Sequence, residues 1–256
     1  MQNDLMLDAF ANQGAGLRSI TSQVAPRVIA MACHGSQQDE LPLLWSLCST
    51  LVDIGYPVAV LDATTRESGD NPGLEQLLND TYWPGDLSSE ALSWSVIPAA
   101  LGLKRLTSPK LGARPPFEPL SGLFQSFGVV VIYAHADVLT LLLPNSGIEP
   151  LVTVSPAKMS PITAYQALKK MLLNAKLRPT IASIVHAPLS KTEQINHTSV
   201  ENLQKCAMTF LGYRLDSLVV RALPSQDAPS EDVHRLALRL LENAMPLHSN
   251  HFAGSY

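Results

Sequence analysis

The residues best placed to do chemistry lie just after three apolar runs of the chain. A polar loop beginning at His34 follows the first run, Asp62 ends the second, and His135 and Asp137 follow the third. Carboxylates and imidazoles of this kind can ligate a metal ion or exchange protons if the fold brings them together. Two such residues in one loop are more often solvated or capping groups. A catalytic or metal-binding pair at His135 and Asp137 is therefore the less favoured of two open interpretations.

The elements that position these residues begin with a strand, a helix and a second strand. Arg27 to Cys33 is a short apolar run, residues 40 to 54 form an apolar-rich helical pattern closed by Gly55, and Tyr56 to Asp62 is a second apolar run. A continuous apolar strand ending in a carboxylate is typical of a parallel sheet, which carries its functional groups at the carboxyl edge. The segment therefore predicts a βαβ unit.

Five further apolar runs predict additional strands, and most are separated by helical patterns or by segments long enough for a crossover. We therefore predict an α/β fold with a doubly wound, mostly parallel sheet and helices on both faces. The additional strands are expected at Trp94 to Ile97, Gly128 to Tyr133, Pro150 to Val154, Thr180 to Val185 and Ser217 to Ala222.

Two other segments have recognisable character. Residues 106 to 119 contain four prolines, which predicts a surface loop. Residues Glu231 to Met245 repeat apolar residues at helical spacing, which predicts a helix packed on the sheet. A membrane-anchoring amphipathic helix is the alternative, but the fixed cations Arg235 and Arg239 are outnumbered by three acids.

The composition argues against several classes of function. A formal net charge of -4 with only 18 Lys plus Arg provides no basic surface for wrapping nucleic acid. The three cysteines, Cys33, Cys48 and Cys206, are far apart and lack metal-ligand spacing, which predicts free thiols in a reducing compartment and no metal site. The amino terminus lacks the pattern of a signal peptide, so we expect a cytoplasmic protein.

Residues 28 to 62 resemble, without a gap, the first βαβ unit of the MinD/ParA (SIMIBI) class of P-loop ATPases. The resemblance identifies residues 34 to 39 as the phosphate-binding loop. It places Gly35 at the signature Lys, Glu40 at the phosphate-binding Lys and Leu41 at the Thr that holds Mg²⁺.

This loop is degenerate, because Asp39 and Glu40 would face a polyphosphate with like charge. One such pair at about 4 Å costs about 4 kcal/mol at the effective dielectric of a protein surface. The same two acids suit the first turn and the dipole of a helix, where we also expect Pro42 to be tolerated. The resemblance therefore implies a folded loop that has lost ATP binding.

The run from Val129 to Tyr133 resembles the Walker B strand of the same class, with Tyr133 where the Mg²⁺-linked Asp belongs. Asp62 is kept, whereas Thr64 replaces the second, catalytic Asp. His34, at the mouth of the loop, is either an anion contact or an ordinary polar loop residue. The predicted degenerate nucleotide site comprises Gly35, Asp39, Glu40, Leu41, Asp62, Thr64 and Tyr133.

Further segments resemble the flagellar-number regulators of this class, the FlhG/FleN branch. Val96 to Leu103 is similar to a strand ending in Ile-Pro-Ala, followed by a Gly-containing turn into a helix. Val154 to Lys169 is similar to the Pro-containing segment that leads into a helix with an Ile-Thr-x-Ala-Tyr start, and Phe210 to Val219 matches the last helix-to-strand turn.

The amino-terminal residues Asn12 to Arg18 resemble the Asp-Gln-Ala-x-Gly-Leu-Arg motif of the same regulators. In that family the motif binds FlhF, an SRP-type GTPase, and its Gln assists GTP hydrolysis by orienting water. The resemblance makes Gln13 a GTPase-activating candidate, with Gly16, Leu17 and Arg18 as partner contacts. A functionless terminus is the open alternative.

These features together predict a partner-binding extension (1–25), a degenerate MinD-like domain (26–246) and a flexible tail (247–256). We expect a non-hydrolysing regulator that uses no cofactor, binds a protein partner and does not bind nucleic acid. Because Gly35 replaces the signature Lys, we expect neither an ATP-driven homodimer nor reversible membrane docking, whereas a constitutive homodimer through other surfaces stays an open alternative. The alternatives are an ATPase with an atypical P-loop and an accessory protein of another envelope system, such as cellulose secretion.

Overall fold

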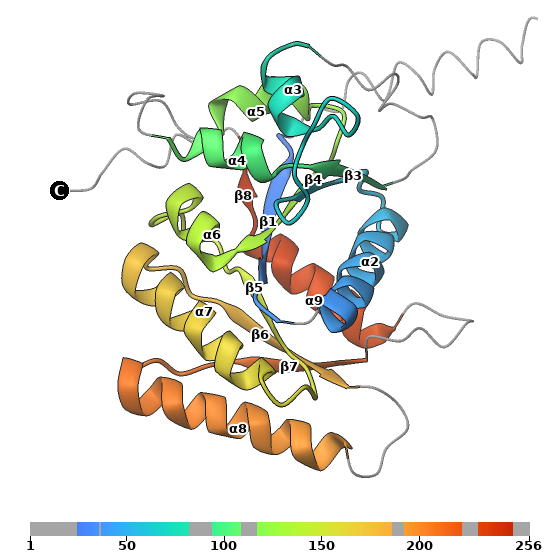
Figure 1. The fold of residues 1–256 in the computed structure, drawn as a ribbon. Coiled ribbons are helices and arrows are strands. Elements are labelled where there is room, and N and C mark those ends of the chain that lie inside the picture. Colours follow the sequence, from blue (N-terminus) through green and yellow to red (C-terminus); the bar gives the residue numbers. More distant parts are fainter. Residues whose placement is uncertain are drawn as a thin grey trace, which may run out of the picture.

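The computed structural model contains one eight-stranded sheet with helices on both faces (Figure 1). It describes residues 25–35, 37–81, 94–108, 117–185, 192–221 and 230–247, with side chains from residue 199 in the helix that begins at 192. The strands are β1 (Arg27–Cys33), β2 (Val58–Asp62), β3 (Trp94–Pro98), β4 (Val129–His135), β5 (Leu151–Val154), β6 (Thr180–Val185), β7 (Ser217–Arg221) and β8 (Met245–Pro246). The helices are α2 (Gln37–Asp53), α3 (Leu74–Leu78), α4 (Ala100–Leu106), α5 (Glu118–Leu123), α6 (Ala136–Leu142), α7 (Ser160–Ala175), α8 (Thr192–Leu211) and α9 (Glu231–Glu242).

The strand order is β3-β2-β4-β1-β5-β6-β7, and each neighbouring pair in this path is parallel. All seven predicted strands are present within a few residues of their expected ends, and the predicted fold class is confirmed. Strand β4 lies between β1 and β2, so the two strands of the first βαβ unit are not direct neighbours. This insertion places the carboxyl ends of β1, β2 and β4 side by side.

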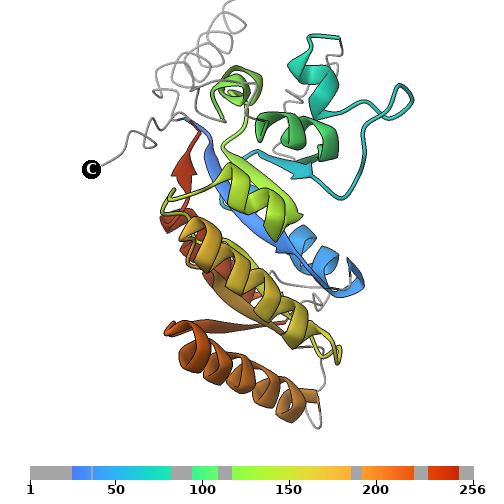
Figure 2. The same ribbon diagram turned by 60° about the vertical axis from the view of Figure 1, so that its left-hand side comes forward.

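Alternate residues of the central strand supply the two cores. Val28, Ala30 and Ala32 of β1 point to one face, while Ile29 and Met31 point to the other. Strand residues alternate between the faces of a sheet, so a strand buried on both sides is apolar throughout. Helices α6, α7 and α8 lie in a row over the first face, and α2 and α9 cover the second (Figures 1 and 2).

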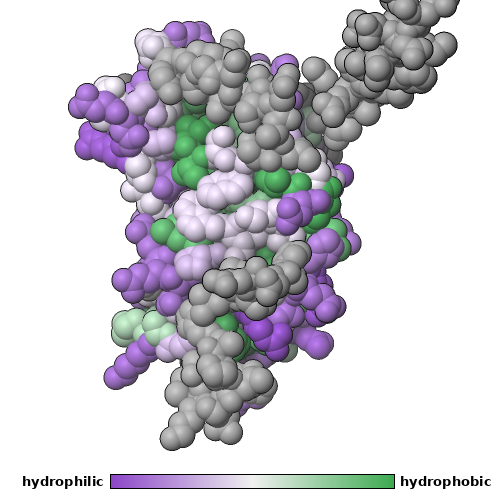
Figure 3. Space-filling view, turned by 90° about the vertical axis from the view of Figure 1, so that its right-hand side faces the viewer, coloured by the Kyte–Doolittle hydropathy of each residue, from purple (hydrophilic) through white to green (hydrophobic). Residues whose placement is uncertain are grey.

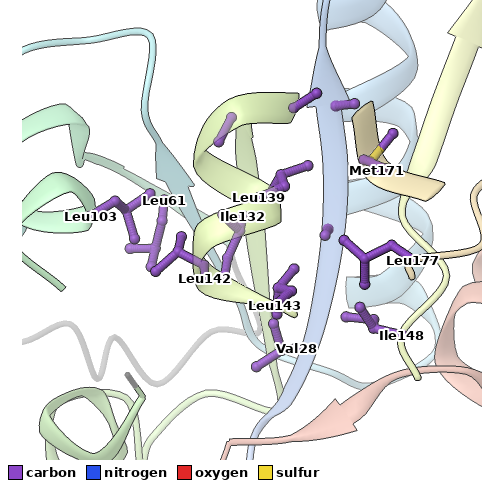
Figure 4. Close-up of a cluster of buried hydrophobic side chains, with 14 of the residues drawn as sticks. Val28, Leu61, Leu103, Ile132, Leu139, Leu142, Leu143, Ile148, Met171 and Leu177 are labelled. Carbon is purple, nitrogen blue, oxygen red and sulfur yellow. The ribbon is translucent and has the colours of Figure 1, made fainter. Parts of the chain in front are cut away.

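Helix α6 is anchored by leucines directed into the first core. Leu139 and Leu142 of α6 and the following Leu143 are fully buried, and they lie among Ile132 of β4 and Val28 of β1 (Figure 4). Burying a leucine side chain stabilises the fold by about 1.5–3 kcal/mol. This anchoring holds the start of α6 at the carboxyl end of β4.

The opposite side of the molecule carries α2. Apolar and weakly polar residues gather near the centre of this side, with hydrophilic residues around them (Figure 3). Trp45 of α2 stacks on Trp94 of β3 with ring centroids 4.9 Å apart. Such offset aromatic pairs add about 0.5–1.5 kcal/mol beyond their buried area. The pair fixes α2 over the β2–β3 edge.

The start of α2 differs from the prediction. The helix begins at Gln37, so the expected loop of residues 34 to 39 is wrong from Gln37 onward. No glycine lies between Gln37 and Asp39 to favour a non-helical backbone, so these residues extend the helix and gain its hydrogen bonds. Pro42 consequently lies inside the helix rather than in its first turn, beyond the four N–H groups that need no helical partner.

Two further differences concern helix boundaries. Helix α9 ends at Glu242, and Met245 and Pro246 form β8, which pairs antiparallel with Val28 and Arg27. The predicted helix end at Met245 was therefore wrong, because Met245 becomes buried by pairing with the sheet. Gly102 was expected in a turn but lies inside α4, where a Cβ would come within 2.5 Å of Leu74.

Candidate functional site

The centre of the site is Glu40, in the first turn of α2. This side chain is completely buried, and one carboxylate oxygen, Oε1, accepts hydrogen bonds from the backbone N–H of Gly35 at 2.7 Å and of His34 at 3.3 Å. A Cβ atom on Gly35 would lie 3.1 Å from the same oxygen, so the glycine permits this close approach. The carboxylate therefore occupies the backbone donors at the β1–α2 junction.

Tyr133 completes the coordination of this carboxylate from the end of β4. Its hydroxyl donates to the other oxygen of Glu40, Oε2, at 2.7 Å, and its side chain is fully buried. Tyr133 lies beside Met31 of β1 and Asp62 of β2 in the sheet register. A buried carboxylate with three donors is stabilised, whereas one left unpaired would cost several kcal/mol.

The groups around Glu40 are held in their neutral forms. Burial, together with hydrogen bonding to Cys33 and Glu40, raises the pKa of Tyr133 far above its usual range. Burial also raises the pKa of the Cys33 thiol, and the negative charge of Glu40 acts in the same direction. Tyr133 and Cys33 therefore resist deprotonation and add no negative charge beside the Glu40 carboxylate.

His34 is a buried link rather than a solvated loop residue, since its side chain is 5% exposed. Nδ1 of His34 lies 3.1 Å from the hydroxyl oxygen of Thr163 on α7, within hydrogen-bond distance. On the other side of the ring, Nε2 lies 3.5 Å from Thr153 Oγ1 and 3.9 Å from Glu40 Oε1. Burial lowers the pKa of His34, and the Glu40 carboxylate partly opposes this.

Asp62 is bonded to the turn that follows it. Its Oδ1 accepts from the N–H and hydroxyl of Thr64 at 2.8 and 2.6 Å, and its Oδ2 accepts from the hydroxyl of Thr65 at 2.7 Å. Such local side-chain bonds are the usual way in which an Asp stabilises a turn. Both oxygens of Asp62 are therefore used structurally.

The structure separates the roles of His135 and Asp137. His135 Nδ1 lies 2.9 Å from the Cys33 carbonyl, whereas Asp137 forms an ion pair with Lys170 at 2.6 Å. No hydrogen bond joins the two residues within the described part of the chain. Among the described residues, moreover, no group of three His, Cys, Asp or Glu could hold a metal ion.

Some of the remaining predicted site residues lie in the described part of the chain and others lie outside it. Asp39 is half-buried in the first turn of α2, and Leu41 packs against the core on that side of the sheet. A leucine there supplies no hydroxyl for a cation. The partner-binding candidates Gln13, Gly16, Leu17 and Arg18 lie outside the described residues.

Sequence reasoning missed Glu67, a second buried carboxylate. It accepts from the N–H groups of Leu101 at 2.7 Å and Gly102 at 2.8 Å, and so caps the start of α4. Glu67 is 34 residues from Leu101, so no local pattern pointed to it. The contact of His34 with Thr163, 129 residues apart, was missed for the same reason.

Within the ranges that the structure describes, no helix is long and apolar enough to cross a bilayer. Neither a protein-family profile nor a curated protein matches the sequence. Comparison of structures is more informative, because folds persist after sequence similarity has been lost.

Three solved structures illustrate the match. MinD of Aquifex aeolicus is 14% identical with a TM-score of 0.52, over 87% of this chain and 99% of that one. The MinC:MinD complex of the same organism is 13% identical with a TM-score of 0.51, over 87% and 98%. Cobyrinic acid a,c-diamide synthase of Mycobacterium smegmatis, solved with ADP and magnesium, is 14% identical with a TM-score of 0.57, over 85% and 94%. The chain therefore has the fold of the MinD/ParA class of P-loop ATPases.

Proposed function

We propose that this chain is a non-hydrolysing regulatory protein with a MinD-like fold, which acts through contacts with other proteins. The observation that carries the proposal is the buried carboxylate of Glu40 on the backbone donors of His34 and Gly35. In a working P-loop, backbone N–H groups of the corresponding loop bind nucleotide phosphates. In this chain they bind a side chain of the protein itself.

Three substitutions act together against bound Mg·ATP. Glu40 supplies negative charge where the resemblance expects the phosphate-binding Lys, Leu41 packs against the core instead of offering a hydroxyl, and Tyr133 donates to Glu40 instead of ligating magnesium. A phosphate could enter only if Glu40 gave up three hydrogen bonds, each worth about 1.5–3 kcal/mol for a charged group. These residues do not fit a magnesium nucleotide.

Calorimetric titration with Mg·ATP and with Mg·ADP tests this proposal. The wild-type protein should give no saturable heat at millimolar nucleotide, while a MinD protein with an intact P-loop serves as the positive control. Glu40→Lys is the informative comparison, with circular dichroism to establish that it is folded. Saturable micromolar binding by the wild type would overturn the proposal in favour of an ATPase with an atypical loop.

We further propose that the protein acts in flagellar biosynthesis and placement by stimulating an FlhF-type SRP GTPase. Support comes from the resemblance of residues 12 to 18 to the Gln-containing motif of flagellar-number regulators. The amide of Gln13 can both donate to and accept from a water molecule that attacks a γ-phosphate. A complex of the similar protein MinD with MinC is an example of this fold acting on a protein partner.

A peptide of residues 1 to 25 tests this second part. It should accelerate GTP hydrolysis by the FlhF protein of the same organism, and Gln13→Ala should abolish the acceleration. Gln23→Ala is the matched control, because it removes the same side chain from the same peptide. Failure of the wild-type peptide to accelerate hydrolysis would refute the GTPase-activating role and leave the calorimetric result untouched.

A further inference from the structure

A groove lies between α6 and α7, on the face of the sheet opposite α2. Its volume is about 630 Å³, and it runs from His34 and His135 at the carboxyl ends of β1 and β4 along α7 past Gln166, Leu173 and Asn174. Helices α6 and α7 lie side by side in both ribbon views (Figures 1 and 2). The groove is therefore an open channel between two packed helices.

Large apolar side chains are exposed on the two helices that form this groove. Leu141 on α6 is 61% exposed, and on α7 Ile162 and Leu173 are 50% and 62% exposed. Ile162 and Leu173 are eleven residues apart, about three helical turns, so they lie on the same side of α7. Met159, just before α7, is 59% exposed. Of these residues, Leu173 lines the groove itself. An exposed apolar side chain beside a groove favours an interaction site.

The charges beside these apolar residues are mostly positive. Helix α7 contains Lys169 and Lys170 and no acid, and Lys158 and Lys176 stand just outside its two ends. The acidic residue of α6, Asp137, is paired with Lys170. The whole chain has a formal net charge of -4, so the charges on α7 are opposite in sign to that of the protein as a whole.

We propose that the groove between α6 and α7 binds an amphipathic helix of a partner protein that carries acidic residues beside its apolar face. Helices that bind grooves place apolar residues every three or four positions into them, and complementary charges at the rim select the partner. This inference rests on the proposed function, because it names the surface through which a partner would be held.

Other occupants fit the same observations less well. A second copy joined through the same face would place Lys169 and Lys170 on both sides of one interface without added acids, since a two-fold interface repeats one patch on both sides. A lipid surface requires a protruding apolar face. Here Leu173 borders a channel that also contains the amides of Gln166 and Asn174.

The groove is connected to the Glu40 site through His34. The backbone N–H of His34 donates to Glu40, while its ring contacts Thr163 on α7. Under the proposed function, Glu40 takes the place of a bound phosphate on the N–H groups of this junction, so the groove should keep its shape whether or not nucleotide is present. Partner binding should therefore be constitutive, with the same affinity in the presence and absence of Mg·ATP.

The test uses the full-length chain and a synthetic 18-residue helical peptide with leucines on one face and glutamates on the other. A second peptide with lysines in place of the glutamates controls for apolar binding alone. Fluorescence anisotropy should show saturable binding of the acidic peptide, and the double variant Lys169→Glu, Lys170→Glu should weaken it about tenfold or more. Leu173→Asp should weaken it similarly.

The matched control lies on α8, where Met208 and Phe210 are 58% and 72% exposed outside the groove. Met208→Ser with Phe210→Ser should leave the affinity for the acidic peptide unchanged. Equal binding of the lysine peptide, or loss of binding in the α8 variant alone, would overturn the proposal.

Three other results would assign the groove to a different occupant and also overturn it. These are concentration-dependent dimerisation abolished by Leu173→Asp, binding to phosphatidylglycerol vesicles abolished by the same substitution, and tighter binding of a peptide of residues 1 to 24 than of the acidic probe. Peptide binding that requires Mg·ATP would instead contradict the proposed function, while the assignment of the groove as the peptide-binding site would be retained.

Discussion

The hydroxyl of Tyr133 donates to the carboxylate of Glu40 across 2.7 Å, although the two residues are 93 positions apart in the chain. Both side chains are fully buried at the carboxyl edge of the sheet. Each residue stands where the sequence resemblance to the MinD/ParA class expects a nucleotide-binding group, and each provides the hydrogen-bond partner of the other. The two substitutions are therefore best understood as one coupled change.

This coupling can be measured with a double-mutant cycle. Tyr133→Phe should lower the free energy of unfolding by about 2 kcal/mol, because it removes a donor from a buried charge. Glu40→Gln should also be destabilising, and the double variant should cost less than the sum of the two by about 1 kcal/mol or more. Urea denaturation provides the values.

Tyr56→Phe is the control for this cycle, since Tyr56 is half-buried on the same side of the sheet. It should change the free energy of unfolding by less than about 0.5 kcal/mol. Additive effects of the Tyr133 and Glu40 substitutions would show that the hydrogen bond between them contributes nothing to stability.

The buried His34 predicts a loss of stability in mild acid. Its pKa in the folded protein is lowered from the usual value of 6.5, chiefly by burial. Below about pH 6.5 the unfolded chain therefore binds a proton that the folded chain does not, and stability falls as the pH decreases toward the folded pKa.

Unfolding free energies measured from pH 7.5 to 5.0 test this prediction. The wild type should lose more stability over this range than His34→Gln, which cannot titrate at this position. His234→Gln, at an exposed position on α9, is the control and should retain the wild-type pH dependence. Identical slopes for the wild type and His34→Gln would contradict the assignment.

The thiols should differ in reactivity. Burial raises the pKa of Cys48 to about 12 and raises that of Cys33 as well, whereas Cys206 on α8 is only half-buried. Because the thiolate is the reactive form, Ellman's reagent at pH 8 should modify Cys206 in the native protein and the other two only after unfolding. Cys206→Ser should remove the native reaction. A rapid native reaction at Cys33 would mean that the β1–α2 junction opens readily.

A glycine near the buried Glu67 should tolerate no side chain. A Cβ on Gly73 would lie 2.1 Å from the Pro98 carbonyl oxygen and 2.8 Å from Cγ of Glu67. Gly73→Ala should therefore lower stability by about 2 kcal/mol or more through overpacking. Gly69→Ala is the matched control, because a Cβ there meets nothing within 4 Å. Equal melting temperatures for the two variants would refute this explanation.

The strands were the most predictable part of the fold. Arg27 to Cys33 and Thr180 to Val185 were predicted with both ends correct, and the other five expected strands shifted by no more than about two residues at either end. Buried parallel strands are continuous apolar runs, so the signal lies within each segment. The prediction that the charges of Asp39 and Glu40 make the β1–α2 junction unsuited to phosphate likewise needs no knowledge of the fold.

By itself, then, the sequence determined the fold class and the strand positions, since each strand is recognised from residues close together in the chain. Only the tertiary structure decided that β4 lies between β1 and β2, so that Tyr133 meets Glu40. It also decided that Met245 joins the sheet and that α6 and α7 form a groove. These features depend on contacts between segments that are far apart in the chain. Such contacts stabilise the fold only once the sheet has brought the segments together.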